Sequence, residues 1–286
     1  MQKYIVKANV KEQSAKDYLK RHENISSSLW KKIKQQNEFF LNGQKTPPTR
    51  AFVKPGDIIE YNITEQSKVI PTDLPFTIRY EDEYLLIADK PAGMLTHPLT
   101  FEAENTLANA VMYHFQKTGQ QFGCHPLYRL DRNTSGLVVF AKLPQLQYLF
   151  GGNHQKLKRY YLAIVHGKIT PPDGTVDAPI GRMENSIIMH QVTPDGKKAV
   201  THYHTLKTCQ NRSLIELNLE TGRTHQIRVH MSHIGHPLLG DDLYGGKRDL
   251  IMRHALHAYK LQFIHPFTHE EIIIENPLPA DMLNLL

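Results

Sequence analysis

The stretch that decides the fold is Leu127-Tyr128-Arg129-Leu130-Asp131-Arg132-Asn133-Thr134-Ser135-Gly136-Leu137-Val138-Val139-Phe140-Ala141-Lys142. Its second half, residues 137–141, is a short apolar run rich in β-branched residues, which predicts a buried strand. Its polar half places one carboxylate, Asp131, between the guanidinium groups of Arg129 and Arg132, and these cations favour the ionised acid at neutral pH. An ionised acid on a tight loop beside a strand is a candidate for chemistry. The simpler alternative is a structural ion pair within a turn.

Length and composition are those of an ordinary folded protein. The chain has 286 residues, of which 40% are hydrophobic and 22% charged, enough for one large domain or two. No apolar run approaches the roughly 20 residues that a membrane helix needs, and the N-terminus has no signal-peptide pattern. Cys124 and Cys209 lie far apart and form no metal or disulfide pattern. We therefore expect a cytoplasmic protein that makes no membrane contact.

Positive charge is concentrated at the N-terminal end of the chain. Residues 1–70 contain 13 Lys and Arg against 7 Asp and Glu, whereas residues 71–286 contain 21 of each. Lys31, Lys32 and Lys34 surround the exposed side of one expected helix. A basic surface confined to one segment favours a polyanionic partner such as RNA, and a solvated helix without a partner is the alternative.

The first 70 residues have the pattern of a small α/β module. Two short helices, one ending at His22 and one over 29–36, are each preceded by serines that can cap them. Asn42-Gly43 predicts a two-residue hairpin, and a turn precedes a strand over 58–61. A proline-containing linker follows, so we expect a domain boundary near residue 70.

The remaining chain alternates short strands with loops and contains few helices. Asn105 is expected to cap one helix and Thr224 a second, which Gly235 would end. Because consecutive strands are often joined by hairpins, this pattern predicts an α+β fold with an antiparallel-rich mixed sheet and a central cleft. Strands are expected over residues 84–89, 137–141, 158–167, 198–206 and 212–219.

Several ordered segments resemble the RluA-type pseudouridine synthases. Residues 129–136 resemble the signature loop of that family, in which Arg-Leu-Asp is followed shortly by Thr-Ser-Gly, although Tyr128 stands where the family usually has His. Residues 1–70 look like an S4-type RNA-binding module. The likeness to the synthases covers roughly residues 75–280, with further matching segments at 89–98, 159–167, 222–230 and 236–245.

This resemblance implies an enzyme that isomerises specific uridines of structured ribosomal or transfer RNA to pseudouridine. The family's catalytic acid corresponds to Asp131, acting at C1′, at C6 or in deprotonation at C2′. Arg228 matches the arginine that pairs with this acid, and Tyr161 matches the active-site tyrosine. Arg129 is the candidate for filling the space that a flipped nucleotide leaves. Substrate or RNA contacts are expected from Arg129, Arg132, Thr134, His225, Lys31, Lys32 and Lys34.

The resemblance also divides the chain into an S4-like module, residues 1–70, and a catalytic domain, residues 71–286. The reaction involves neither a redox change nor a phosphoryl group, so we expect no cofactor. We also expect no metal, and a monomer. Two other interpretations stay open. One is a non-catalytic RNA-binding protein, supported by Tyr128; the other is a metal-dependent hydrolase that uses His225, His230 and His233.

Overall fold

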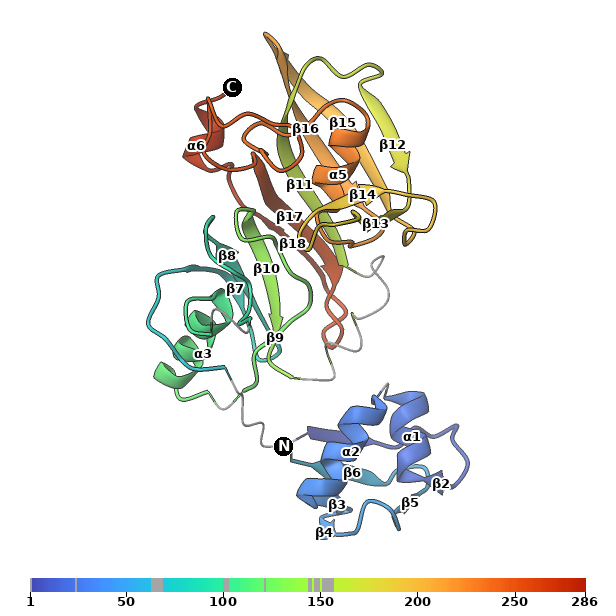
Figure 1. Cartoon of the computed structure of the whole chain (residues 1–286). Helices are drawn as coiled ribbons and strands as arrows, with labels where there is room; N and C mark the ends of the chain where they lie inside the picture. Colours follow the sequence, from blue (N-terminus) through green and yellow to red (C-terminus); the bar gives the residue numbers. More distant parts are fainter. Residues whose placement is uncertain are drawn as a thin grey trace.

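The computed structural model describes residues 2–23, 25–62, 69–99, 103–120, 122–143, 146, 150 and 157–286. Its strands form one ten-stranded mixed sheet and three smaller sheets, accompanied by short helices (Figure 1). The predicted α+β class is therefore confirmed. Across these described ranges, no helix is both long enough and apolar enough to span a membrane.

Residues 2–62 build an α/β unit with its own hydrophobic core. Tyr18, Trp30 and Phe39 are buried together in this core. The sheet runs in the order β1 (Gln2–Ile5), β6 (Ile58–Tyr61), β3 (Phe39–Leu41) and β4 (Gln44–Lys45), and a second pair joins β2 (Gln13–Ser14) to β5 (Phe52–Val53). The helices are α1 (Ala15–His22) and α2 (Ser27–Gln36).

The predicted serine caps and the predicted tight turn of this unit are confirmed. The hydroxyls of Ser14 and Ser26 each accept a hydrogen bond from a backbone N–H in the first turn of their helix, both at 3.1 Å. These bonds satisfy donors that a helix start otherwise leaves unpaired. Asn42 and Gly43 have φ angles of 52° and 78° and form the tight turn between β3 and β4.

The large sheet carries most of the remaining chain. Its expected strands are all present, and antiparallel pairs dominate. The order is β12 (Asp173–Asp177), β15 (Val200–Cys209), β16 (Arg212–Leu219), β11 (Leu157–His166), β17 (Leu256–Ile264), β10 (Ser135–Ala141), β8 (Leu85–Lys90) and β7 (Thr77–Glu81). In addition, β18 (Glu271–Glu275) pairs with β17, and β9 (His125–Pro126) pairs with β10.

Strand β17 changes partner along its length, and the change occurs beside the loop that carries Asp131. Its first residues pair in parallel with β10, where Ser135 lies opposite His257 and Gly136 opposite Ala258. From Lys260 onward it pairs with β18 instead. Gly136 has a φ of 112°, and a Cβ added there would lie 2.2 Å from the carbonyl oxygen of Ala258. Only glycine fits this junction.

Changing Gly136 to Ala should destabilise the protein by about 3 kcal/mol or more, because the new methyl group meets fixed backbone at a positive φ. Denaturant unfolding measures the loss. Gly119→Ala is the matched control, since Gly119 also has a positive φ, 71°, but nothing lies within 4 Å of the added Cβ. An equal loss in the two variants would refute the steric argument.

Within the described part of the chain, three helices accompany the large sheet (Figure 1). The first, α3 (Leu107–Lys117), buries Leu107, Val111 and Phe115 in the same core as strands β8 and β10. The second, α5 (Gln226–His233), contacts β15 and β14 (His190–Val192), which pairs with β13 (Ile180–Arg182). The third is α6 (Ala280–Leu283).

Two predicted helix starts were wrong by one residue. Helix α3 is capped by Thr106 rather than Asn105, because the side-chain oxygen of Asn109 accepts the backbone N–H of Thr106 at 3.0 Å. Helix α5 is preceded by His225, in a left-handed conformation, rather than capped by Thr224. The predicted end of α5 is confirmed, since Gly235 follows it with a φ of 83°.

Candidate active site

The loop that carries Asp131 is held on both sides by hydrogen bonds. The backbone N–H of Thr134 donates to the carbonyl of Asp131 at 3.1 Å. On the other side, the hydroxyl of Thr96 both donates to the carbonyl of Leu130 and accepts its N–H, each at 3.1 Å. These contacts fix the backbone, so the carboxylate has a defined direction.

Lys90 lies fully buried under the same loop and was missed as a site residue. Its ammonium donates to the carbonyls of Pro91, Met94 and Arg132 at 2.9, 2.7 and 2.9 Å. Burial lowers the pKa of Lys90 to about 7, while nearby Asp131 opposes this change. Three carbonyl acceptors match the three donors of an ammonium and favour its charged form. Lys90 therefore connects the strand β8 to the Asp131 loop.

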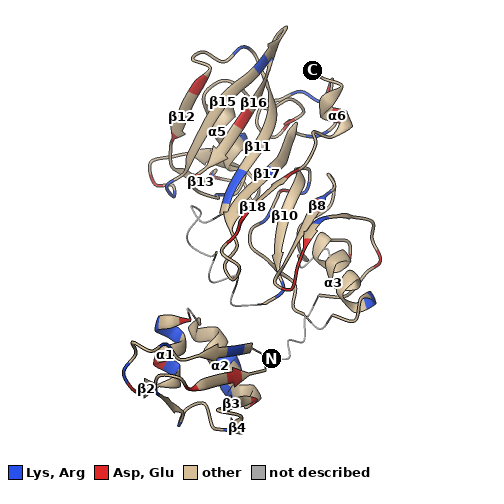
Figure 2. Ribbon diagram, turned by 180° about the vertical axis from the view of Figure 1, so that it is seen from behind, with Lys and Arg blue, Asp and Glu red and all other residues tan. Residues whose placement is uncertain are grey.

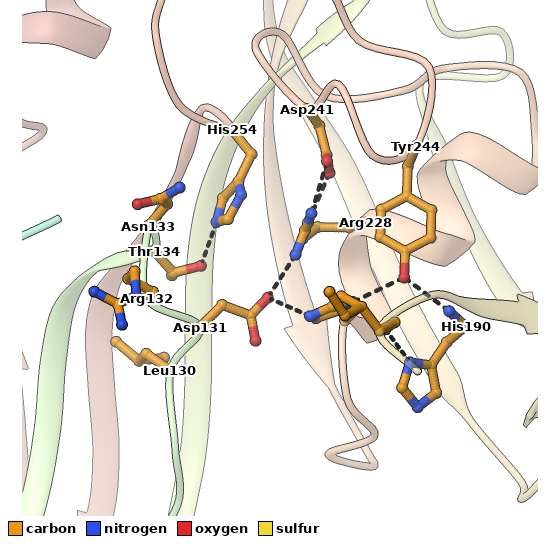
Figure 3. A network of polar contacts seen from close by, with 12 residues as sticks. Leu130, Asp131, Arg132, Asn133, Thr134, His190, Arg228, Asp241, Tyr244 and His254 are labelled. Atoms are coloured by element: carbon orange, nitrogen blue, oxygen red, sulfur yellow. Dashed lines mark hydrogen bonds and ion pairs between the residues drawn. The ribbon is translucent and has the colours of Figure 1, made fainter. Parts of the chain in front are cut away.

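Arg228, on α5, is held by two carboxylates (Figure 3). Its Nη1 donates to Asp131 Oδ2 at 3.1 Å, and its Nε and Nη2 donate to the two oxygens of Asp241 at 2.7 and 2.8 Å. The guanidinium carbon also lies 4.9 Å from the ring centre of Tyr244. Asp241 is buried, so this bidentate pair fixes the guanidinium where it meets Asp131. The matching segment contained Asp241 and Tyr244, but no role was predicted for either.

The carboxylate of Asp131 is ionised at neutral pH. Burial would raise the pKa of Asp131, but its electrostatic interactions with His225, Arg228 and His254, together with the hydrogen bond from Arg228, outweigh burial and hold the pKa below its ordinary value. Burial lowers the pKa of His254 to about 3, so this ring is neutral at pH 7 and Arg228 supplies the permanent charge. Oδ2 is bound by Arg228, and no described residue forms a hydrogen bond with Oδ1.

Tyr161 and Tyr160, neighbours on β11, face opposite ways, as the alternation of a strand predicts. Tyr161 is buried and lines a cleft with Asp131. Burial raises the pKa of Tyr161, although Arg159 opposes the change, so its phenol is neutral. The Tyr160 ring instead lies 5.9 Å from the Lys260 ammonium, outside the cleft lining.

The cleft brings together some of the predicted substrate contacts and not others. Arg129 lines it and is exposed. Thr134 also lines it, but its hydroxyl lies 2.8 Å from Nε2 of His254. Arg132 is absent from the described lining and directs Nη1 toward the carbonyl of Gly93 at 3.4 Å. The described residues that line it are Arg129, Leu130, Asp131, Thr134, Tyr161, Leu219, Arg223, His225, Gln226, Ile227, Arg228 and Leu256.

The three predicted lysine contacts belong to the N-terminal unit rather than to this cleft. Lys31, Lys32 and Lys34 are exposed on α2. Figure 2 shows basic positions on both α1 and α2. They form a surface that a large polyanion could contact apart from the cleft.

Tyr128, the departure from the family pattern, occupies a packing position. Its hydroxyl donates to the carbonyl of Leu137 at 2.8 Å, and the guanidinium of Arg159 lies 4.9 Å from its ring centre. It packs against two of the hydrophobic clusters and does not contribute to the described lining of the cleft. The substitution therefore removes no group from the cleft.

The three histidines of the metal interpretation do not converge. His230 is buried, and its ring nitrogens lie 2.9 Å from the Thr201 hydroxyl and 2.9 Å from the Ala178 carbonyl. His233 is exposed at the end of α5. Over the described part of the chain, no three His, Cys, Asp or Glu side chains gather in a group that could hold a metal ion.

Comparison with known proteins links this geometry to one enzyme family. The model of a family described as RNA pseudouridylate synthase matches residues 84–233. The chain is 44% identical to the uncharacterized RNA pseudouridine synthase YhcT of Bacillus subtilis (strain 168), over 88% of this chain and 83% of that protein. It is 39% identical to ribosomal large subunit pseudouridine synthase D of Pasteurella multocida (strain Pm70), over 92% and 86%. Among solved structures, human RNA pseudouridylate synthase domain containing 1 matches with a TM-score of 0.58 and 25% identity, over 72% of this chain and 87% of that one.

Proposed function

Because the chain belongs to the RluA-type family of RNA pseudouridine synthases, we propose that Asp131 is the catalytic acid with which it converts uridine to pseudouridine. One observation carries this assignment: Arg228 binds only one oxygen of Asp131, Oδ2, at 3.1 Å. The other oxygen, Oδ1, is left for the substrate. An ionised carboxylate with one oxygen held and one available is suited to covalent or proton-transfer chemistry.

The neighbouring residues fit the geometry that this reaction needs. The uracil must leave C1′, turn, and rejoin the sugar through C5, so the nucleotide must first leave its stack, at a cost of a few kcal/mol. Tyr161 lines the cleft beside Asp131 and stacks on the flipped uracil. The exposed Arg129 fills the space that the nucleotide leaves in the RNA. Arg132, outside the lining, contacts the RNA backbone.

The substrate that we propose is ribosomal RNA of the large subunit. Relatives of 34–42% identity carry the name ribosomal large subunit pseudouridine synthase D, which supports this substrate. With this substrate, the enzyme that we propose works in the cytoplasm. Asp131, Tyr161 and Arg228, the proposed catalytic residues, meet in one cleft of the chain, so the active unit that we propose is a monomer. Residues 1–70 act as the S4-like RNA-binding module and residues 71–286 as the catalytic domain.

Tritium release tests this function directly. Large-subunit ribosomal RNA and transfer RNA, labelled with tritium at uracil C5 and taken from cells lacking this protein, are each incubated with the purified chain. Pseudouridine formation exchanges that hydrogen into water. We expect release from the ribosomal RNA and not from the transfer RNA. Release from transfer RNA alone would overturn the proposed substrate, and no release from either RNA would favour the non-catalytic RNA-binding interpretation.

Replacing Lys31, Lys32 and Lys34 together by Gln should weaken RNA binding and flatten its salt dependence. Each phosphate contact contributes about 0.7–0.9 to the slope of log K against log salt concentration, so three contacts contribute roughly 2. Filter binding at several salt concentrations measures the slope. The triple Arg variant keeps the charge and should keep the slope. Equal slopes for the Gln variant and the native protein would refute RNA binding by α2.

A further inference from the structure

The hydroxyl of Tyr244 (Figure 3) forms hydrogen bonds with a backbone N–H and with a histidine ring. The donor and acceptor capacities of these two groups determine where the phenolic proton lies. The backbone N–H of His190 donates to the Tyr244 oxygen at 3.0 Å. Nδ1 of His225 lies 2.8 Å from the same oxygen. A backbone N–H is always a donor, so the Tyr244 oxygen accepts from His190. Among the described residues, Nδ1 of His225 is the only acceptor within hydrogen-bond distance of this hydroxyl, so we assign the phenolic proton to His225. Nδ1 of His225 is therefore the acceptor.

This arrangement selects one tautomer of His225. A neutral imidazole whose Nδ1 accepts a hydrogen bond carries its proton on Nε2. Burial lowers the pKa of His225, and Arg228 and His190 add to this effect although Asp131 opposes it. The ring is thus neutral at pH 7, with Nε2–H as its donor.

Nε2 of His225 lies near Asp131 but is not hydrogen-bonded to it. It lies 3.8 Å from Asp131 Oδ2, too far for a hydrogen bond. No described residue forms a hydrogen bond with this nitrogen, and the ring belongs to the lining of the cleft. A donor is therefore available beside the proposed catalytic carboxylate.

The protein holds this ring in place at some conformational cost. His225 has a φ of 57° and a ψ of 19°, a left-handed backbone conformation that costs roughly 1–2 kcal/mol outside glycine. His190 and Tyr244 pack edge-on against the imidazole, each with its ring centre 5.6 Å away. Strain that the surroundings maintain at a cleft indicates that the position of the ring matters for function.

We propose that His225, oriented by Tyr244, donates a hydrogen bond through Nε2–H to an acceptor oxygen of the flipped uridine beside Asp131. This inference rests on the proposed role of Asp131. When the bond between uracil and C1′ breaks, its electron pair leaves with the base and negative charge spreads onto the uracil oxygens. A fixed donor at that point stabilises the transition state more than the bound uridine. Because its exposed nitrogen already carries a proton, His225 is not the base that removes the C5 proton.

Two substitutions of His225 test the donor. His225→Leu removes it at similar size, and His225→Gln keeps an N–H near the position of Nε2. We expect Leu to lower kcat by about 10²- to 10³-fold, as the loss of one oxyanion donor does, with KM changed less than threefold. Gln should recover most of the rate, to within about tenfold of the native enzyme. If Gln is as slow as Leu while both variants melt like the native protein, the donor role is refuted.

A third variant tests the part played by Tyr244. Tyr244→Phe keeps the ring that packs on Arg228 but frees Nδ1 of His225 to take a proton. We expect the native kcat to be flat near pH 6.5, the ordinary pKa of histidine. In the variant the neutral ring can carry its proton on Nδ1 instead of Nε2, so kcat should be highest at low pH, where the imidazolium carries both protons, and should fall as the ring loses one. Nitrogen-15 NMR of the native protein should show Nδ1 without a proton and Nε2 with one. The opposite tautomer, or an unchanged pH profile in the variant, would overturn the proposal.

The Asp131→Asn variant distinguishes a failure of the donor role of His225 from a failure of the proposed catalytic role of Asp131. An inactive Asp131→Asn variant beside a fully active His225→Leu variant would refute only the donor role. A fully active Asp131→Asn variant would refute the assignment of Asp131 as the catalytic acid itself.

Discussion

Asp131→Asn should lower the rate of pseudouridine formation by about 10⁴-fold or more, because the amide can neither act as a nucleophile nor accept a proton. The substitution keeps the size of the side chain and a carbonyl oxygen that can still accept from Arg228, which lies 3.1 Å from Oδ2 in the native protein. RNA affinity should therefore stay within about threefold of the native value, since phosphate contacts dominate it. Single-turnover tritium release measures the rate, and fluorescence anisotropy measures the affinity.

Asp242→Asn is the matched control for this variant. Asp242 is an exposed acid in the segment that also contains Asp241, and its carboxylate is paired with Arg248 at 2.8 Å. Its removal should leave both the rate and the affinity unchanged, because exposed ion pairs contribute little. If Asp131→Asn lost binding and turnover in equal proportion, Asp131 would be a structural residue and the proposed mechanism would be wrong.

Arg228→Met should lower both the stability of the protein and the rate of pseudouridine formation. The loss of stability should come through Asp241 and the loss of rate through Asp131. Removal of the guanidinium leaves Asp241 buried without a partner, because both of its oxygens accept from Arg228. A stranded buried charge costs about 3–5 kcal/mol, which chemical denaturation can measure. The rate should fall by about 10²-fold or more, since Asp131 loses the donor that orients it.

The double variant Arg228→Met with Asp241→Leu separates the two routes. Replacing both members of a buried ion pair by apolar residues restores much of the stability, but it returns no partner to Asp131. We therefore expect a stable and slow enzyme. Recovery of the rate together with the stability would show that Arg228 serves only the fold.

The pH dependence of the double variant gives a further check. Electrostatic interactions with His225 and Arg228, and the hydrogen bond from Arg228, hold the native pKa of Asp131 below its ordinary value of 3.8 against the effect of burial. Catalysis needs the ionised acid, so the native rate should fall only at pH values below that. Without Arg228 the pKa rises, and the acidic limb should move to higher pH. An unmoved limb would contradict the electrostatic role of Arg228.

Features that depend on neighbouring residues were predictable from the sequence. The serine caps of α1 and α2 and the Asn42-Gly43 turn each involve groups only a few residues apart. Their geometry follows from local backbone preferences, so a short stretch of sequence contains the information. The first turn of α5 shows the limit of such signals. There Thr224 had the side chain of a cap, but His225 takes up the left-handed conformation instead, with its ring bonded to Tyr244.

The candidate site was predictable only through likeness to a family. Asp131 and Arg228 lie 97 positions apart, and no period or spacing in one sequence reveals that they meet. The same limit applied to Tyr128, whose departure from the family pattern could be judged only once its hydroxyl was found bonded to the carbonyl of Leu137.

The sequence by itself indicated Asp131 as a candidate acid on a loop, the buried strand behind that loop and the basic character of the first 70 residues. The tertiary structure decided what holds that acid in place. Asp241 fixes Arg228, Lys90 binds the carbonyl of Arg132, and Tyr244 orients His225. The physical reason is that these partners come from different strands and loops. Their meeting depends on the order and register of the sheet, which no local preference specifies.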